Sequence, residues 1–343
     1  MEILGEIQTS VDTRMTRRSV LRVALATAAL AAATPVRAQQ MQTHMPPGVM
    51  PKRKGPLVFL DYDKDEIDAA YDQAPWAPNQ AEIAKRRDQK SAAAIARLGP
   101  PRRLAYGSTD VEKLDIYTTK KPNAPVNVFI HGGAWQAGSA ANGAYMSEMF
   151  VDSGAHFVAL DFNNVIETSG NLMTMAEQVR RAVAWVHRNA AVFGGDSNRL
   201  YISGVSSGAH LASVVLTTDW QKDFGLPADM IRGGLCMSGM YDMKPVRISK
   251  RSSYVKFTDA MEHAMSTQRH LDMLRAPVVV THGTDETPEF QRQNRDFVAA
   301  VKTAGKPAEL VVAQHYNHFE MGESIANPYG PNGRAALAMM KLA

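Results

Sequence analysis

Short apolar runs alternate with longer stretches of helical periodicity from residue 99 to the C-terminus. The clearest helix is predicted for residues 173–192, where five apolar residues fall on one face before Gly194 and Gly195 end the pattern. Two more helices are predicted for residues 207–217 and 288–304. Eight strands are predicted around these helices, at residues 103–106, 113–117, 126–130, 156–161, 199–203, 233–238, 277–281 and 309–313.

This alternation is typical of an α/β fold with a mostly parallel sheet that helices cover on both faces. We expect a single domain over residues 61–343. Residues 240–274 interrupt the alternation of strands and helices with a charged stretch that has no strand signal. An insert of this kind between two core strands is either a lid or substrate-binding insert, or a surface excursion.

The first 38 residues have the layout of an export signal. Arg17 and Arg18 precede an apolar stretch at residues 23–33, and small residues follow up to Ala38. The paired arginines resemble a bacterial twin-arginine signal, so we expect cleavage after Ala38 and a periplasmic or secreted product. A flexible leader is expected at residues 39–60. The alternative is a frayed amphipathic helix at the N-terminus.

Composition and charge exclude several classes of protein. The chain has 343 residues, of which 45% are hydrophobic and 21% charged, close to the globular average. Its net charge is +4, and residues 1–38 hold five arginines against three acidic residues, with no basic run afterwards, so no nucleic-acid partner is expected. The apolar stretch near the N-terminus is shorter than the roughly 20 residues that span a bilayer, so no permanent membrane span is expected.

Metal and cofactor chemistry has no signature in the sequence. The lone Cys236 excludes an intrachain disulfide and a cysteine-based zinc site. No HExxH motif or other close set of His and carboxylate residues indicates a metal ion. We therefore expect no metal and no cofactor.

The strand predicted at 199–203 leads directly into Gly204-Val205-Ser206-Ser207-Gly208, and a helix follows. Strand, sharp turn and helix are the context in which a G-x-S-x-G motif presents a nucleophile. The helix dipole at this turn favours a developing anion, so Ser206 is the predicted nucleophile. The backbone N–H of Ser207 is predicted to help form the oxyanion hole.

A second motif follows the strand predicted at 126–130, where the sequence is His131-Gly132-Gly133-Ala134-Trp135. Two glycines after a buried strand let backbone N–H groups point into a cleft, so Gly133 and Ala134 are predicted oxyanion donors. His131 is predicted to brace this loop. Trp135 is either a substrate-binding pocket wall or part of the core.

A nucleophilic serine needs a base, and the base needs an acid that orients it. Candidates lie in two loops, at residues 282–287 and 314–320, which follow the strands predicted at 277–281 and 309–313. The carboxyl ends of parallel strands meet at one edge of a sheet, where open α/β sheets bind ligands. Both loops are therefore expected beside the Ser206 turn.

Taken together, these segments resemble an α/β-hydrolase of the esterase/lipase group, and more closely its kynurenine formamidase-like branch. The resemblance runs from about Tyr71 to the C-terminus and is carried by HGGAW at 131–135, EQVRRAVAW at 177–185, GVSSGAHLA at 204–212, PEFQRQ at 288–293 and NHFE at 317–320. It implies an eight-stranded, mostly parallel sheet and hydrolysis of esters or aryl formamides without a metal.

The resemblance also implies the acid and the base of the site. The family pattern places the acid two residues before the proline of PEF, which is Glu286 in this chain, with Asp285 one step early as the alternative. Most relatives have Asp here, so Glu286 is a departure. The base falls on His318, and His315 is the alternative.

Three functions are weighed on this basis. The first is a secreted serine hydrolase that cleaves carboxylic esters through Ser206, His318 and Glu286 and an acyl-enzyme intermediate. The second is an arylformamidase that cleaves a C–N bond in a small amide. The third is a non-catalytic binding module on a hydrolase scaffold. The expected partner is a small-molecule ester or amide.

Overall fold

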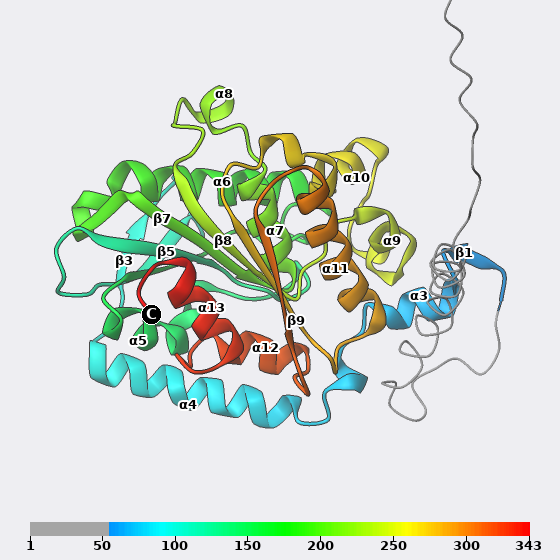
Figure 1. Cartoon of the computed structure of the whole chain (residues 1–343), viewed down its shortest axis with the longest axis horizontal. Coiled ribbons are helices and arrows are strands. Elements are labelled where there is room, and N and C mark those ends of the chain that lie inside the picture. The colour runs from blue at the N-terminus through cyan, green and yellow to red at the C-terminus, as the bar shows by residue number, and fades with distance from the viewer. Residues whose placement is uncertain (1–54) are drawn as a thin grey trace, which may run out of the picture. The chain divides into compact units, whose positions relative to one another are not determined.

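An eight-stranded sheet forms the centre of the structure, a computed structural model that describes residues 55–343 (Figure 1). The strand order is β10-β9-β8-β7-β5-β6-β4-β3. Every neighbouring pair is parallel except β3 with β4 and β4 with β6, so β4 alone runs against the other strands. The strands are β3 (Arg102–Ala105), β4 (Lys113–Tyr117), β5 (Ala124–Ile130), β6 (His156–Leu160), β7 (Gly195–Val205), β8 (Ile231–Met237), β9 (Val278–Gly283) and β10 (Ala308–Ala313).

The central strands are buried on both faces, which explains their continuous apolar runs. In β5, Val126, Val128 and Ile130 pack into the larger core cluster, whereas Phe129 points to the opposite face and packs into the smaller one. Asn127 is a buried polar residue of this strand, and its side-chain amide donates to Ser203 Oγ on β7 at 2.9 Å.

Helices cover both faces of the sheet, as the sequence predicts. One layer contains α6 (Leu172–Asn189), α7 (Ser207–Leu216) and α11 (Pro288–Thr303), whose apolar faces belong to the larger core cluster. The other layer contains α4 (Gln80–Leu98), α5 (Ala144–Asp152), α12 (His318–Ser324) and α13 (Pro331–Met339), which lie on the opposite side of the sheet in Figure 1. Shorter helices are α3 (Lys64–Ala70), α8 (Trp220–Phe224), α9 (Met243–Ile248), α10 (Asp259–Met265) and the single turns η1 (Ala74–Trp76), η2 (Ala140–Gly143), η3 (Ala190–Phe193), η4 (Lys250–Ser253), η5 (Thr267–Arg269) and η6 (Leu271–Met273).

The sequence analysis places the end of the flexible leader at residue 60, but the structure already has a strand at residues 57–59. Strand β1 (Leu57–Phe59) pairs antiparallel with β2 (Tyr62–Asp63) in a small separate sheet, because a tight turn at Leu60 brings the two strands together. Asp63 then caps α3 with its side chain. The predicted signal at residues 1–38 and most of the leader lie outside the described residues.

Residues 240–274 are helical and are anchored to the helix layer that contains α11. The N–H groups of Tyr241 and Asp242 both donate to Gln293 Oε1, at 2.7 and 2.9 Å. The ring of Tyr241 stacks on Phe297 with the ring centres 4.0 Å apart. The first residues of this insert therefore pack into the core. Farther along the insert, Arg251 lines the cavity described below.

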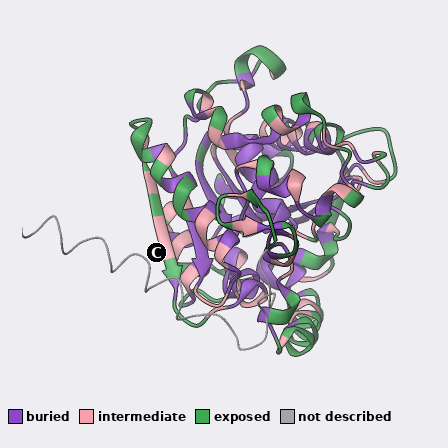
Figure 2. Ribbon diagram, turned by 90° about the vertical axis from the view of Figure 1, so that its right-hand side faces the viewer, coloured by how far each residue is buried: buried purple, intermediate pink, exposed green. Residues whose placement is uncertain are grey.

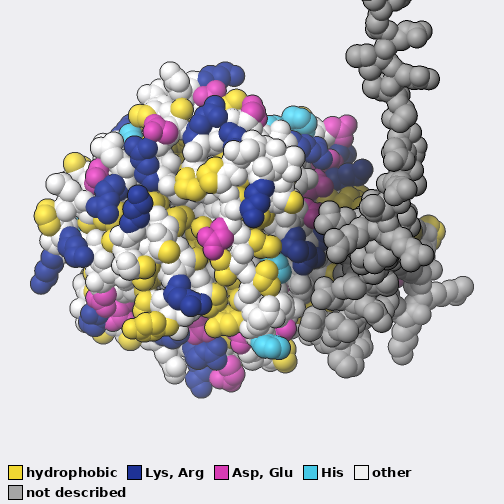
Figure 3. Space-filling model, viewed as in Figure 1, with side chains coloured by type: hydrophobic (Ala, Val, Ile, Leu, Met, Phe, Trp, Pro, Cys, Tyr) yellow, Lys and Arg dark blue, Asp and Glu magenta, His cyan; other side chains and the backbone are white. Residues whose placement is uncertain are grey.

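Exposed positions lie mainly on the outer sides of the helices, in loops and on the edge strands, whereas the inner strands of the sheet are buried (Figure 2). On the face shown in Figure 3, Lys and Arg side chains are dispersed among apolar and uncharged ones. No helix within residues 55–343 is both long and apolar enough to cross a membrane. The same residues hold no group of three or more His, Cys, Asp or Glu side chains arranged to hold a metal ion.

Candidate active site

Ser206 lies on a strained turn between β7 and α7. Its backbone angles are φ 58° and ψ −124°, a conformation that costs a non-glycine residue on the order of 1–3 kcal/mol. The turn is held by the N–H of Ser206, which donates to Met237 O at 2.8 Å. A Cβ atom on Gly204 would overlap the backbone of Gly208, and one on Gly208 would overlap the carbonyl oxygen of Ile130. The two glycines of the motif therefore let α7 begin directly against the end of β5.

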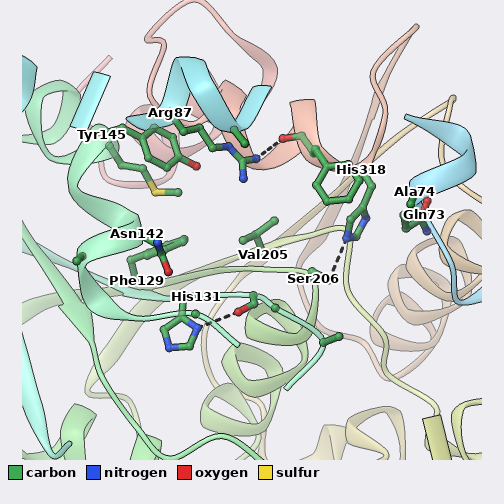
Figure 4. Close-up of a pocket in the computed structure, with 18 of the residues that line it drawn as sticks. Gln73, Ala74, Arg87, Phe129, His131, Asn142, Tyr145, Val205, Ser206 and His318 are labelled. Carbon is green, nitrogen blue, oxygen red and sulfur yellow. Dashed lines mark hydrogen bonds between the residues drawn. The ribbon is translucent and has the colours of Figure 1, made fainter. Parts of the chain in front are cut away.

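The structure brings Ser206, His318 and Glu286 together. Ser206 Oγ is 2.9 Å from His318 Nε2 (Figure 4). His318 Nδ1 is 2.7 Å from Glu286 Oε2. A carboxylate only accepts hydrogen bonds, so Nδ1 carries the proton and Nε2 accepts from the serine hydroxyl. Glu286 is fully buried, whereas Ser206 and His318 each keep 8% of their surface exposed at the cavity. This is the geometry that lets an imidazole remove the proton of a serine hydroxyl.

The carboxylate of Glu286 is held by two groups that the sequence analysis does not single out. Glu286 Oε1 accepts from the hydroxyl of Ser238 at 2.7 Å and from the N–H of Gly283 at 2.8 Å. Ser238 directly follows β8 and has φ 54°, so it stands at the same sheet edge as Ser206. The sequence gives one indication of this location, because Ser238 is the last residue of the strand predicted at 233–238.

The two alternative residues lie elsewhere. The side chain of Asp285 contacts Thr284 Oγ1 at 3.2 Å rather than either ring nitrogen of His318. His315 is an exposed residue at φ 62°, and its backbone N–H donates to Thr284 Oγ1 at 2.8 Å. The structure therefore brings Glu286 and His318, and neither of the two alternatives, into the chain of contacts with Ser206.

Three backbone N–H groups beside Ser206 have no acceptor among the described residues. They belong to Gly133, Ala134 and Ser207, the predicted oxyanion donors. The side chain of Ser207 fixes the two segments to each other, because its Oγ accepts from the N–H of Trp135 at 3.2 Å. Ala134 is held at φ 55°, which turns this loop sharply after β5. Free N–H donors next to a nucleophile can stabilise a tetrahedral oxyanion.

Trp135 does not line the cavity. Its ring is 2% exposed and packs edge-on against His210, with 5.3 Å between the ring centres. The guanidinium of Arg251 lies over the same ring at 5.3 Å. Of the two alternatives predicted for Trp135, the structure shows the core, beneath the site, and Arg251 is a residue of the cavity lining that the sequence analysis missed.

A cavity of about 660 Å³ opens in front of Ser206 and His318. Figure 4 shows Phe129, Asn142 and Tyr145 around it, with Arg87 held by the carbonyl of Phe319. A space of this size accommodates a small organic molecule. The other lining residues are Tyr71, Asp72, Gln73, Ala74, Ala84, Asp88, Ser91, His131, Gly132, Gly133, Ala134, Gly138, Ala141, Met146, Val205 and Arg251.

The other histidines near the site are structural. His131 Nδ1 lies 2.8 Å from Gly132 O, and its ring stacks on Phe162 at 4.3 Å, which braces the loop as predicted. His210 is buried under Trp135, with Nε2 at 3.0 Å from Met265 O. Burial lowers the pKa of His131, and it lowers the pKa of His210 to about 4. Both rings are thus neutral at pH 7.

The buried His210 makes the stability of the fold depend on pH. Between about pH 6.5 and pH 4, the unfolded chain binds a proton at this ring that the folded chain does not. The free energy of unfolding therefore falls as the pH is lowered through this window, by roughly 3 kcal/mol from His210 alone. Urea unfolding at pH 7 and pH 4.5 should show a smaller fall for His210→Gln than for the unaltered protein.

The control for this prediction is His315→Asn, because the side chain of His315 is exposed. It should keep the pH dependence of the unaltered protein. An equal fall in His210→Gln and in the unaltered protein would show that His210 is not the group responsible.

The sheet, its two helix layers and the strand–serine–helix turn define an α/β-hydrolase. The chain is an α/β-hydrolase similar to kynurenine formamidases and esterases. A family model described as BD-FAE matches residues 114–232, which include the HGGAW and GVSSG motifs.

Two curated relatives illustrate the similarity. Kynurenine formamidase of Danio rerio is 29% identical over 280 residues, which are 77% of this chain and 92% of the relative. The isoprenylcysteine alpha-carbonyl methylesterase ICME of Arabidopsis thaliana is 25% identical over 243 residues, 64% of this chain and 56% of the relative. The chain is therefore similar to hydrolases of both amides and esters.

Solved structures share the fold. A candidate thioesterase from a Silicibacter species superposes with a TM-score of 0.69 at 22% identity, covering 80% of this chain and 99% of the other. Esterase 2 of Thermogutta terrifontis superposes with a TM-score of 0.54 at 23% identity, covering 71% of this chain and 90% of the other. At these identities the likeness concerns the fold.

Proposed function

We propose that this protein is a serine hydrolase that cleaves carboxylic esters of small molecules. The observation that carries the proposal is the chain of contacts from Ser206 through His318 to Glu286, at 2.9 and 2.7 Å, on the wall of a cavity. Relatives that are esterases add support. The same contacts argue against a purely non-catalytic binding role, because a binding protein has no need of a base beside a strained serine.

The proposed reaction proceeds through an acyl-enzyme. His318 Nε2 removes the proton as Ser206 Oγ attacks the carbonyl carbon, and Glu286 balances the charge of the imidazolium. The N–H groups of Gly133, Ala134 and Ser207 stabilise the oxyanion of the tetrahedral intermediate. The imidazolium then protonates the leaving alcohol, and a water molecule releases the acyl group by the same steps.

An arylformamidase is the second candidate, favoured by the similarity to kynurenine formamidases over most of their length. The same three side chains and N–H donors would act, with an aryl amine as the leaving group.

We also propose that residues 1–38 direct export by a twin-arginine route. An exported enzyme meets esters and amides from outside the cell, which favours the ester hypothesis.

The first experiment compares kcat/KM of the chain from Gln39 onward on a short-chain p-nitrophenyl ester and on N-formylkynurenine. Dominant ester turnover supports the esterase, and dominant formamide cleavage supports the second candidate. Ser206→Ala protein is the blank for both substrates. A fluorophosphonate reagent should also add one adduct per chain, located at Ser206 by mass spectrometry. Absence of both turnover and adduct would overturn the proposed function.

A further inference from the structure

Arg251 is a buried cation whose hydrogen-bond partners within residues 55–343 are all neutral. It is 6% exposed, on the turn η4, and it lines the same cavity as Ser206 and His318. Its Nη1 donates to the hydroxyl of Tyr254 at 3.0 Å and its Nη2 to the carbonyl of Tyr71 at 3.3 Å. The guanidinium also lies over the rings of Trp135 and Tyr71, at 5.3 and 5.6 Å.

None of these contacts is an ion pair: the carboxylate that interacts electrostatically with Arg251, that of Asp72, is bonded to Lys250 instead. Buried charges are normally paired, because an unpaired charge in a low dielectric is costly. Two of the five N–H groups of the guanidinium donate to protein oxygens, and Nε is enclosed without a partner. The aromatic rings hold the plane of the group in place. A planar guanidinium held in this way is suited to binding a carboxylate through two parallel hydrogen bonds.

The space beside Arg251 extends away from Ser206. A second cavity of about 400 Å³ shares Tyr71, Asp72, Ala134 and Arg251 with the larger one. Its lining contains two cations, Lys250 and Arg251, against the single carboxylate of Asp72. Lys250 Nζ pairs with that carboxylate at 3.0 Å. Because the carboxylate of Asp72 interacts with both cations, one net positive charge remains at this end, and Arg251 is the cation that lacks an ion pair.

We propose that Arg251 binds a carboxylate carried by the substrate, so that the enzyme prefers esters or amides of molecules that bear a second, anionic group. This inference rests on the proposed function, because it names the substrate class of the same site. A purely structural Arg251 would only tie η4 to the end of α3 through the carbonyl of Tyr71. Such a role does not distinguish a charged ligand from a neutral one.

Binding without catalysis gives the first test. Ser206→Ala protein is titrated calorimetrically with glutarate and with glutaramide, which have the same carbon chain. We expect glutarate to bind at least tenfold more tightly, and Arg251→Met in the same background to abolish that preference. Equal affinity for the two compounds, or a preference that survives Arg251→Met, would overturn the inference. This readout does not require turnover, so it stands even if the proposed hydrolysis fails.

Kinetics on matched substrates give the second test. The acyl side is probed with mono-p-nitrophenyl glutarate against p-nitrophenyl valerate, and the leaving-group side with 4-acetoxybenzoate against phenyl acetate. In at least one pair, Arg251→Met should lower kcat/KM for the charged ester by about 10- to 100-fold more than for the neutral one, mainly through KM. Arg251→Lys should retain part of the preference, because it keeps the charge and loses the planar fork.

Arg275→Met is the matched control, since Arg275 is exposed, lies outside the cavity and donates to the carbonyl of Asp272. It should leave all four rates unchanged. If Arg251→Met lowered charged and neutral esters equally in both pairs, its role would be structural. Should that variant fail to fold, the glutarate preference of the Ser206→Ala protein and the rates of Arg251→Lys decide the question.

Discussion

Replacing Ser206 with Ala is expected to lower kcat on a p-nitrophenyl ester by about 10⁵- to 10⁶-fold. Alanine has no nucleophile to offer His318 Nε2, which is 2.9 Å from Ser206 Oγ. The N–H donors at Gly133 and Ala134 remain and account for the residual rate. Alanine at φ 58° carries the same backbone strain as serine, so the midpoint of thermal unfolding should change little. Pre-steady-state and steady-state assays, with circular dichroism on the same samples, measure both effects.

Ser207→Ala is the matched control for this variant. It keeps the backbone N–H that we propose as an oxyanion donor and removes only the bond from Trp135 N–H to Ser207 Oγ. We expect a loss of no more than about tenfold, the scale of one hydrogen bond. A larger loss of kcat in Ser207→Ala than in Ser206→Ala would show that Ser207, and not Ser206, is the nucleophile.

The fold could be predicted wherever periodicity and burial agree. All eight strands of the main sheet lie where they are predicted, within a few residues. The inner strands are largely buried and give continuous apolar runs, whereas the edge strands β3 and β10 are largely exposed. Helix α5 has no such signal, since six of its nine residues are buried and no polar face repeats. Helix α12 is also missed. Its seven residues follow from the capping box of Asn317 and Glu320 rather than from a hydrophobic pattern.

The residues of the candidate site also fall into two groups, those that the sequence predicts and those that it does not. Ser206 and the HGGAW loop are set by local backbone geometry, so glycine spacing reveals them. Ser238 and Arg251 act through partners that are 48 and more than 100 residues away, Glu286 and the two rings of Trp135 and Tyr71. Such contacts exist only once the sheet edge is assembled, so the sequence can place Ser238 at the end of a strand but cannot reveal its partner, and it gives no signal for Arg251.

Replacing Glu286 with Gln is expected to lower kcat by about 10⁴-fold, the second-largest effect in the site. Glu286 Oε1 accepts from Ser238 and Gly283, so the amide oxygen of Gln must stay on that side. Its NH₂ group then faces His318 Nδ1 and donates to it. Nε2 must in that case carry the proton, and it can no longer accept one from Ser206.

Asp285→Asn is the matched control one residue away. The side chain of Asp285 contacts Thr284 and does not reach His318, so kcat should change by less than about threefold. Both variants are assayed at saturating ester across the pH range in which the unaltered enzyme is active. A loss in Asp285→Asn equal to that in Glu286→Gln would contradict the assignment of the acid. A loss confined to Glu286→Gln means that the longer carboxylate, held by Ser238 and Gly283, fixes the tautomer on which the base depends.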